Sequence, residues 1–344
     1  MTSNPELYLT LVGHSGDTES STQTAKDKIE AKARKDEKDM QHMAYNVGSA
    51  PTTSLKAVTS DLSVNKALNH PTHARELRIS MVSELKQMIK KSVLSPDEDR
   101  KATSQGMILL PSSIFCKLKT AANGQFDKAK SRLVAGGHRD PYNPDLKTAS
   151  PVATEATLRT IIAMAVNKGK TLSTIDIGGA YLEVDMHRKN VYIKLPKDIP
   201  KDILTEAGFN PDVEHYHVEK CLYGLRESGL EFYTALRDTL EQGGWLPSDI
   251  DPCLFTKVTK DGRQNYAATT VDDILILADP LEEQQLLETL KRRFEEVKHV
   301  ERANSYVGLN IEYKGNQDQD NWEIFVNQYG FAKRLLRQPQ HTTS

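Results

Sequence analysis

Residues 265–279 read NYAATTVDDILILAD, two apolar runs separated only by the adjacent carboxylates Asp272 and Asp273. This pattern predicts a β-hairpin with both acids at its tip. Neighbours along a strand point to opposite faces, so one carboxylate can bind a cation directly while the other supports it or binds from the edge. For an isolated pair of aspartates, a solvated turn is the stronger alternative.

A second strand end carries another acid. Asp176 ends the apolar run 172–175 and is followed by Gly178, Gly179 and Ala180, small residues that let backbone N–H groups approach a ligand closely. Carboxylates on two adjacent strand ends would suit two Mg²⁺ or Mn²⁺ ions, each keeping open positions for phosphate and water. Such a set is the minimal equipment for two-metal phosphoryl transfer.

A basic strand complements the acids. Lys130 and Arg132 stand two positions apart in KSRLVAGG (130–137), which places both on one face of the predicted strand. A guanidinium fork beside a lysine point charge can bind a triphosphate. Considered without the acids, Lys130 and Arg132 are better interpreted as an ordinary solvent-exposed strand face.

The remaining pattern predicts an α+β fold with an antiparallel hairpin. Leu77, Met81, Leu85 and Ile89 mark one face of an amphipathic helix, and similar spacing predicts helices over 156–166, 229–242 and 281–297. Strands are expected at 107–120, broken at Pro111, and at 130–137, 171–177, 191–196, 265–271 and 274–279. Residues 1–74 lack a regular apolar pattern and are expected to be a polar, disordered leader.

Composition limits the possible functions. The 344 residues carry 45 Lys and Arg against 47 Asp and Glu, a net charge of −2, which argues against a wholly basic nucleic-acid binder. The three cysteines form no CxxC pair, so neither a disulfide framework nor a zinc site is indicated. No apolar run is long enough to span a bilayer and no signal peptide is evident, so a soluble, intracellular protein without a membrane partner is expected.

Six blocks of the chain, in order, resemble the reverse transcriptase of copia-type LTR retrotransposons. They are KSRLVAGGHR (130–139), TASPVATEATLRTIIAMA (148–165), STIDIGGAYLEVDMHRKNVYIKLP (173–196), VEKCLYGLRESGLEFYTAL (218–236), TTVDDILIL (269–277) and YVGLNIEY (306–313). The resemblance covers about residues 75–330. It implies a right-hand polymerase fold, mainly fingers and palm, that copies an RNA or DNA template with a primer.

The resemblance also implies roles for single residues. Asp176, Asp272 and Asp273 would be the metal-binding and catalytic acids, and Lys130 and Arg132 would neutralise the dNTP. The remaining dNTP contacts would come from Ile177, Gly178, Gly179, Ala180, Tyr181 and Glu227. Among these, Tyr181 would exclude a ribose 2′-OH with its ring.

Two departures from the family pattern leave an alternative open. Thr270 stands where the family has Tyr before Val-Asp-Asp, and Glu227 replaces a Gln, which brings negative charge toward the triphosphate. The alternative is an inactive, retrotransposon-derived relic that retains at most nucleic-acid binding. Residues 75–330 are expected to be the fingers and palm and 331–344 a tail, cut off before the RNase H domain and other parts of a polyprotein.

Overall fold

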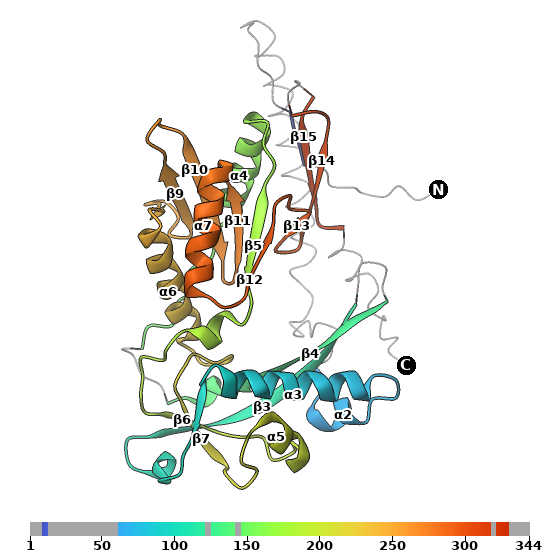
Figure 1. The fold of residues 1–344 in the computed structure, drawn as a ribbon, viewed down its shortest axis with the longest axis vertical. Coiled ribbons are helices and arrows are strands. Elements are labelled where there is room, and N and C mark those ends of the chain that lie inside the picture. Colours follow the sequence, from blue (N-terminus) through green and yellow to red (C-terminus); the bar gives the residue numbers. More distant parts are fainter. Residues whose placement is uncertain (1–8, 13–60, 121–124, 142–145, 318–320, 330–344) are drawn as a thin grey trace, which may run out of the picture.

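The computed structural model describes residues 9–12, 61–120, 125–141, 146–317 and 321–329. Three sheets and the helices packed on them form a mixed α+β fold, which confirms the predicted class (Figure 1). Within these ranges, no helix combines the length and the apolar character needed to cross a membrane.

The largest sheet, called the central sheet below, has six strands, all antiparallel to their neighbours. In spatial order they are β12 (Val297–Val300), β5 (Ser173–Ile177), β11 (Asp273–Leu277), β10 (Gln264–Thr270), β9 (Leu254–Val258) and β8 (Leu246–Pro247). The predicted hairpin is therefore β10 and β11, and β5 pairs with β11 on its other edge. This pairing brings together two strands that are far apart in the sequence.

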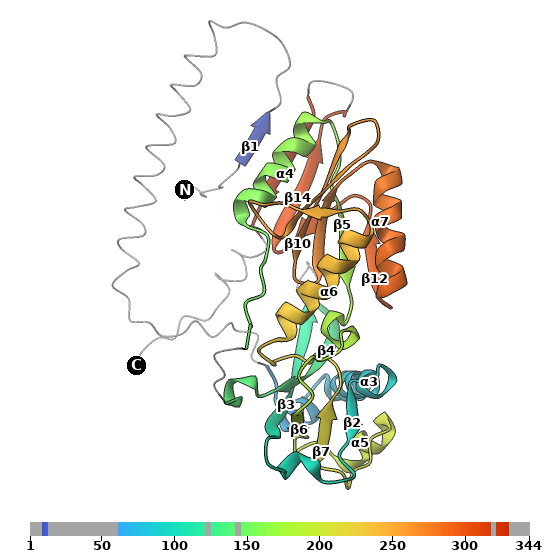
Figure 2. The same ribbon diagram turned by 90° about the vertical axis from the view of Figure 1, so that its left-hand side faces the viewer.

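Helices cover both faces of the central sheet. They are α4 (Glu155–Asn167) on one face and α6 (Ser228–Gln242) and α7 (Pro280–Arg293) on the other (Figure 2). On β11, Ile274 and Ile276 pack in the core with α6 and α7, whereas Leu275 and Leu277 pack in the core with α4. Burial on both faces explains why this strand reads as a continuous apolar run.

A five-stranded sheet forms the second part of the fold, with three helices packed on it. Its strands are β2 (Leu94–Pro96), β7 (His215–Val218), β6 (Val191–Lys194), β3 (Ile108–Thr120) and β4 (Phe126–Ala135), and its helices are α2 (Val64–Leu68), α3 (Ala74–Lys90) and α5 (Lys201–Ala207). Leu77, Met81 and Leu85 of α3 are fully buried, as their spacing predicts, but Ile89 is 39% exposed. Steps of four residues drift around a helix with 3.6 residues per turn, so Met88 and not Ile89 is buried in the last turn.

The predicted break at Pro111 is wrong. β3 is continuous, pairing in parallel with β6 up to Pro111 and antiparallel with β4 from Ser112 onward. The proline lies where the strand exchanges one partner for the other, a position at which its missing N–H does not interrupt a ladder.

A four-stranded sheet packs on the α4 side of the central sheet. Its strands are β1 (Leu9–Val12), β15 (Glu323–Asn327), β14 (Leu309–Lys314) and β13 (Ser305–Tyr306). Ile311 and Ile324 from this sheet are buried in the same core as Leu275.

One predicted domain boundary needs correction. The packed fold begins before residue 75, since Leu62 pairs with Cys116 and Val64 and Ala67 of α2 are buried. One short turn is too brief to show a helical period in the sequence. The rest of the predicted leader lies outside the described residues apart from β1, and the predicted tail 331–344 lies outside them entirely.

The helix predicted over 281–297 ends early. α7 stops at Arg293, and Phe294 has extended backbone angles, φ −119° and ψ 136°. Phe294 is nevertheless buried beside Leu286 and Leu290, so its side chain continues the helical spacing from a connecting segment. Apolar spacing alone does not distinguish these two arrangements.

Candidate active site

The three acids meet at one end of the central sheet. Asp273, the first residue of β11, lies directly opposite Asp176 of β5, and residues opposite each other in a ladder share a face. Asp272 occupies the turn between Thr270 and Asp273, which pair across the hairpin. Its carbonyl oxygen accepts a hydrogen bond of 2.9 Å from the Ile177 N–H, which links the turn to β5.

The turn itself is conformationally unusual. Val271, its first central residue, has φ +55°, a left-handed conformation that two-residue hairpin turns require and that β-branched side chains disfavour. Backbone strain of this kind concentrates at functional sites. The sequence predicted the hairpin, but gave no sign that a valine would occupy this position.

Asp273 is the acid whose protonation is most affected by this arrangement. The pKa of Asp273 is raised to about 6, first by burial and then by the charges of Asp272 and Asp176. Asp176 has a cation close by, since the Nζ of Lys298 on β12 lies 3.5 Å from its Oδ2, but both side chains are largely exposed. Negative charge therefore exceeds its nearby compensation at this end of the sheet.

These residues fit a divalent cation by their chemistry. Hard carboxylate oxygens are the ligands that Mg²⁺ and Mn²⁺ prefer, and a cation would relieve the repulsion that raises the pKa of Asp273. Over the described part of the chain, no three His, Cys, Asp or Glu side chains are already gathered closely enough to hold a metal ion. The carboxylate donors thus lie on adjacent strands and the turn between them, but they are not already arranged around a metal position.

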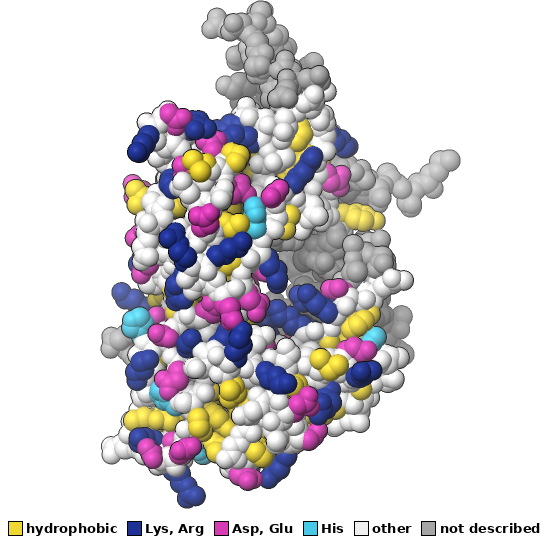
Figure 3. All heavy atoms as spheres, in the orientation of Figure 1, with side chains coloured by type: hydrophobic (Ala, Val, Ile, Leu, Met, Phe, Trp, Pro, Cys, Tyr) yellow, Lys and Arg dark blue, Asp and Glu magenta, His cyan; other side chains and the backbone are white. Residues whose placement is uncertain are grey.

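A basic strand face lies on the neighbouring part of the fold. On β4 the side chains of Lys130 and Arg132 are exposed, whereas Ser131 and Leu133 are buried, so the two cations share one face as predicted. Figure 3 shows Lys and Arg side chains beside Asp and Glu side chains where the lower end of β12 meets the part of the molecule that contains α3 and β4.

The basic face and the acids interact electrostatically. Desolvation, followed by the charges of Arg132 and Lys119, lowers the pKa of Lys130, while Asp272 acts in the opposite direction. The guanidinium of Arg132 stacks on the ring of Tyr223, 4.7 Å from its centroid. Lys130 is therefore within electrostatic range of Asp272, and Arg132 lies beside it on the same strand face.

The segment after Asp176 turns sharply. Gly179 has φ +62° and precedes the short 3₁₀ turn η3 (Ala180–Glu183). The Gly178 N–H donates to the Glu296 carbonyl at 2.8 Å, and the Ile177 N–H is used by Asp272. Two of the backbone donors predicted to meet a triphosphate are therefore engaged inside the protein.

Tyr181 lies close to the acids from within this turn. Its pKa is raised by burial and then by the charge of Asp272. The ring packs edge-on against Tyr223 and Phe232, with centroids 5.4 and 5.9 Å apart. The tyrosine is therefore held by two aromatic neighbours within electrostatic range of Asp272.

Glu227 is bound elsewhere. Its carboxylate is buried and accepts a hydrogen bond of 2.9 Å from the Nε of Arg188, whose other nitrogens bind both oxygens of the buried Asp140. Within the described residues, the Glu227 carboxylate forms its hydrogen bond and ion pair with Arg188 and none with the three aspartates. The negative charge that replaces a glutamine therefore shares one arginine with Asp140, and the Glu227 Oε2 is buried without a hydrogen-bond partner.

Replacing Arg188 by Met should destabilise the fold by about 3–5 kcal/mol, because two buried carboxylates would lose their shared cation. Chemical denaturation at neutral pH measures this change. Arg237→Met is the control, since Arg237 pairs with Asp238 on the surface and should cost about 0.5 kcal/mol or less. Equal losses in the two variants would contradict the buried network.

Sequence reasoning missed Lys298, Tyr223 and Arg188. Tyr223 stands inside a recognised block, so its position offered a signal, although not its contact with Arg132. Arg188 also stands inside a recognised block, but nothing there indicates its two buried carboxylate partners. Lys298 lies outside every block, and only strand register places it beside Asp176.

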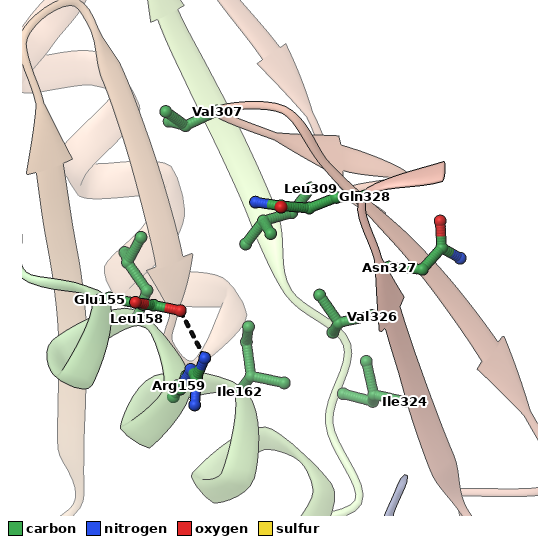
Figure 4. Close-up of a pocket in the computed structure, with 10 residues that line it drawn as sticks. All are labelled: Glu155, Leu158, Arg159, Ile162, Val307, Leu309, Ile324, Val326, Asn327 and Gln328. Carbon is green, nitrogen blue, oxygen red and sulfur yellow. Dashed lines mark hydrogen bonds and ion pairs between the residues drawn. The ribbon is translucent and has the colours of Figure 1, made fainter. Parts of the chain in front are cut away.

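An apolar pocket of about 310 Å³ lies between α4 and the β14–β15 strands (Figure 4). It is lined by Glu155, Leu158, Arg159, Ile162, Val307, Leu309, Ile324, Val326, Asn327 and Gln328. None of the predicted site residues contributes to it, so the acids and the basic strand do not depend on this pocket.

The antiparallel central sheet thus ends in three aspartates, and a strand that presents Lys130 and Arg132 lies on the neighbouring part of the fold. In comparisons with known proteins, residues 108–344 match the family described as reverse transcriptase (RNA-dependent DNA polymerase), so the chain belongs to that family.

Curated relatives come from plant and yeast transposons. The chain is 31% identical over 202 residues to the retrovirus-related Pol polyprotein from transposon RE1 of Arabidopsis thaliana, which covers 57% of the chain and 13% of that protein. It is 22% identical over 296 residues to the polyprotein from transposon TNT 1-94 of Nicotiana tabacum, 83% of the chain and 21% of that protein. The Ty1-LR2 Gag-Pol polyprotein of Saccharomyces cerevisiae is 24% identical over 262 residues, 70% of the chain and 13% of that protein. The chain thus spans a small part of these relatives.

Proposed function

We propose that this chain is the RNA-directed DNA polymerase unit of a copia-type retrotransposon, which joins a dNTP to a primer 3′-OH on an RNA or DNA template. The pairing of Asp176 with Asp273, with Asp272 in the adjoining turn, is the observation that carries the proposal. Membership of the reverse transcriptase family supports it. Other domains of a polyprotein would be its partners.

Under this proposal the two parts of the fold are the palm and the fingers of a right-hand polymerase, within residues 75–330. The central sheet with α6 and α7 would be the palm, and the five-stranded sheet with α3 would be the fingers. The packing of α2 supports an earlier start for the fingers, near Leu62.

Each site residue has a chemical role in this reaction. Asp176, Asp272 and Asp273 would hold two Mg²⁺ or Mn²⁺ ions, which when bound would activate the primer hydroxyl and stabilise the leaving pyrophosphate. Lys130 and Arg132 would neutralise the triphosphate from the basic strand. The ring of Tyr181 and the nearby backbone would border the position of the dNTP sugar, so that a ribose 2′-OH would clash with the ring.

Primer extension on an RNA template tests the proposal. Wild-type protein with Mg²⁺ or Mn²⁺ should extend the primer, and Asp272→Asn should not, because the turn would lose a charged ligand. Asp261→Asn is the matched control, since Asp261 lies on an exposed turn of the same sheet and pairs with Arg263. Wild-type extension no greater than that of Asp272→Asn would refute the polymerase function.

An inactive relic is the second candidate, favoured by Thr270, which stands where the family has a tyrosine. Glu227 no longer favours it, because its carboxylate pairs with Arg188. Such a protein would bind a template–primer duplex, with affinity that falls steeply as salt rises, and would extend nothing. The extension assay separates the two functions. Binding measured between low and physiological salt shows whether a chain that extends nothing still binds the duplex.

A further inference from the structure

The turn that carries Tyr181 is anchored at its last residue, Glu183. The Glu183 Oε1 accepts a hydrogen bond of 2.7 Å from the Nζ of Lys91, and its Oε2 accepts one of 2.8 Å from the Glu295 N–H. The Glu183 carbonyl also accepts two hydrogen bonds of 3.2 Å from the guanidinium of Arg293. One residue thus joins the turn to α3, to the end of α7 and to the segment that leads into β12.

Lys91 is the buried member of this network. It follows the last residue of α3, and its side chain is only 5% exposed, compared with 9% for Glu183. Its ammonium also pairs with the Glu295 carboxylate at 3.1 Å, and a Cβ built on Gly179 would lie 3.8 Å from it. The lysine therefore lies against both ends of the Gly179–Glu183 segment.

Its charge is maintained in this buried position. Burial opposes the charged form, but the hydrogen bonds to Glu183 and Glu295 outweigh it, so the pKa of Lys91 is raised. A buried ion pair costs several kcal/mol when one partner is removed, because the other charge is left uncompensated. Glu183 would then leave its place to reach water, and the turn would move with it.

We propose that Lys91 is a positioning residue that fixes the Gly179–Glu183 turn, and with it the ring of Tyr181, relative to Asp272. The consequence for catalysis rests on the proposed polymerase function, since it assumes that Tyr181 separates deoxynucleotides from ribonucleotides. The anchoring itself is a property of the fold and has its own test.

Lys90 offers a matched control. It is the same residue type at the preceding position, and it also pairs with the Glu295 carboxylate, but its side chain is 68% exposed. It makes no contact with Glu183 among those that the described structure contains. Any effect specific to the anchor should therefore appear on replacement of Lys91 and not of Lys90.

The first experiment measures sugar discrimination, the ratio of kcat/KM for a dNTP to that for the matching rNTP, in Lys91→Met, Lys91→Arg and Lys90→Met. Partial unfolding lowers both rates equally and leaves the ratio unchanged. A displaced ring should lower the ratio roughly tenfold in Lys91→Met, since small misplacements have large kinetic effects. Lys91→Arg, which keeps the charge, and Lys90→Met should stay within about twofold of wild type on the same reasoning.

The second experiment needs no activity. Hydrogen exchange of the amides in residues 177–184 should be faster in Lys91→Met than in Lys90→Met or wild type. If Lys91→Met does not fold, Glu183→Gln, which loses the charge and keeps an acceptor, replaces it in both experiments. Unchanged exchange overturns the anchor. If exchange is faster in Lys91→Met but wild-type protein extends no primer, the anchor is supported and only the polymerase function is refuted. If exchange is faster but sugar discrimination is unchanged, the link to Tyr181 is overturned.

Discussion

Asp176→Asn should lower kcat for primer extension by about a hundredfold or more, because a preorganised charged ligand would be lost where charge develops in the reaction. Asp176 is suited to this test since it lies opposite Asp273 in the ladder and is exposed enough to tolerate replacement. The change removes one of the charges that raise the pKa of Asp273, so the folded state should keep its stability. Steady-state extension with a saturating primer–template duplex measures the loss.

Two comparisons show whether the loss belongs to the carboxylate. Asp185→Asn alters an exposed aspartate beyond the same turn, whose backbone bridge to Lys220 does not depend on its side chain, and it should retain nearly full activity. A chemical denaturation curve of Asp176→Asn should match that of wild type. A variant that retains more than a tenth of wild-type kcat would argue against Asp176 as a metal-binding acid.

Glu84→Gln should raise stability at pH 8 by about 3 kcal/mol, the largest gain that we expect from a single substitution. Glu84 lies on α3 and is 7% exposed, and its Oε1 accepts a hydrogen bond of 3.0 Å from the Leu133 N–H. Burial raises the pKa of its carboxyl to about 7, with the neighbouring Arg132 and Lys130 acting in the opposite direction. Glutamine keeps the acceptor and removes the cost of the buried charge.

The sign of the pH dependence follows from the raised pKa of Glu84. The folded state holds this proton more tightly than the unfolded state, so wild-type stability should fall as pH rises from about 4.5 toward 7. The advantage of Glu84→Gln should therefore shrink toward zero near pH 4. Denaturation at pH 4, 6 and 8 measures it, and Glu76→Gln, a change at a half-exposed position on the same helix, is the control that should show no such trend. A constant difference between the Glu84 variant and wild type would show that Glu84 carries no shifted proton.

Much of the candidate site was predictable because its signals are local. The acids at a hairpin tip follow from apolar runs on both sides of Asp272, and the shared face of Lys130 and Arg132 follows from the period of a strand. Neither inference needs knowledge of distant contacts. The confirmed α+β class has the same origin, since the helices over 155–167 and 228–242 reveal themselves by spacing.

The incorrect predictions share a different origin. Pro111 reads as a break, yet it marks a change of strand partner, and Phe294 continues a helical spacing from outside the helix. The burial of Val64 could not be predicted from the sequence, because α2 is only about one turn long and shows no helical period. The strand β6 that pairs with the segment up to Pro111 lies far away in the sequence, and Phe294 packs against Phe232 of α6 as well as against α7.

The sequence by itself determined the strands, the acids at their ends, the basic face and the resemblance to reverse transcriptases, because residue type and period act within a few positions. Tertiary structure alone decided that Asp176 lies opposite Asp273, that Glu227 pairs with Arg188 and that Lys91 anchors the turn of Tyr181. These arrangements depend on register and on the burial of opposite charges between distant segments. Such charges are stable in a low dielectric only when folding brings them together.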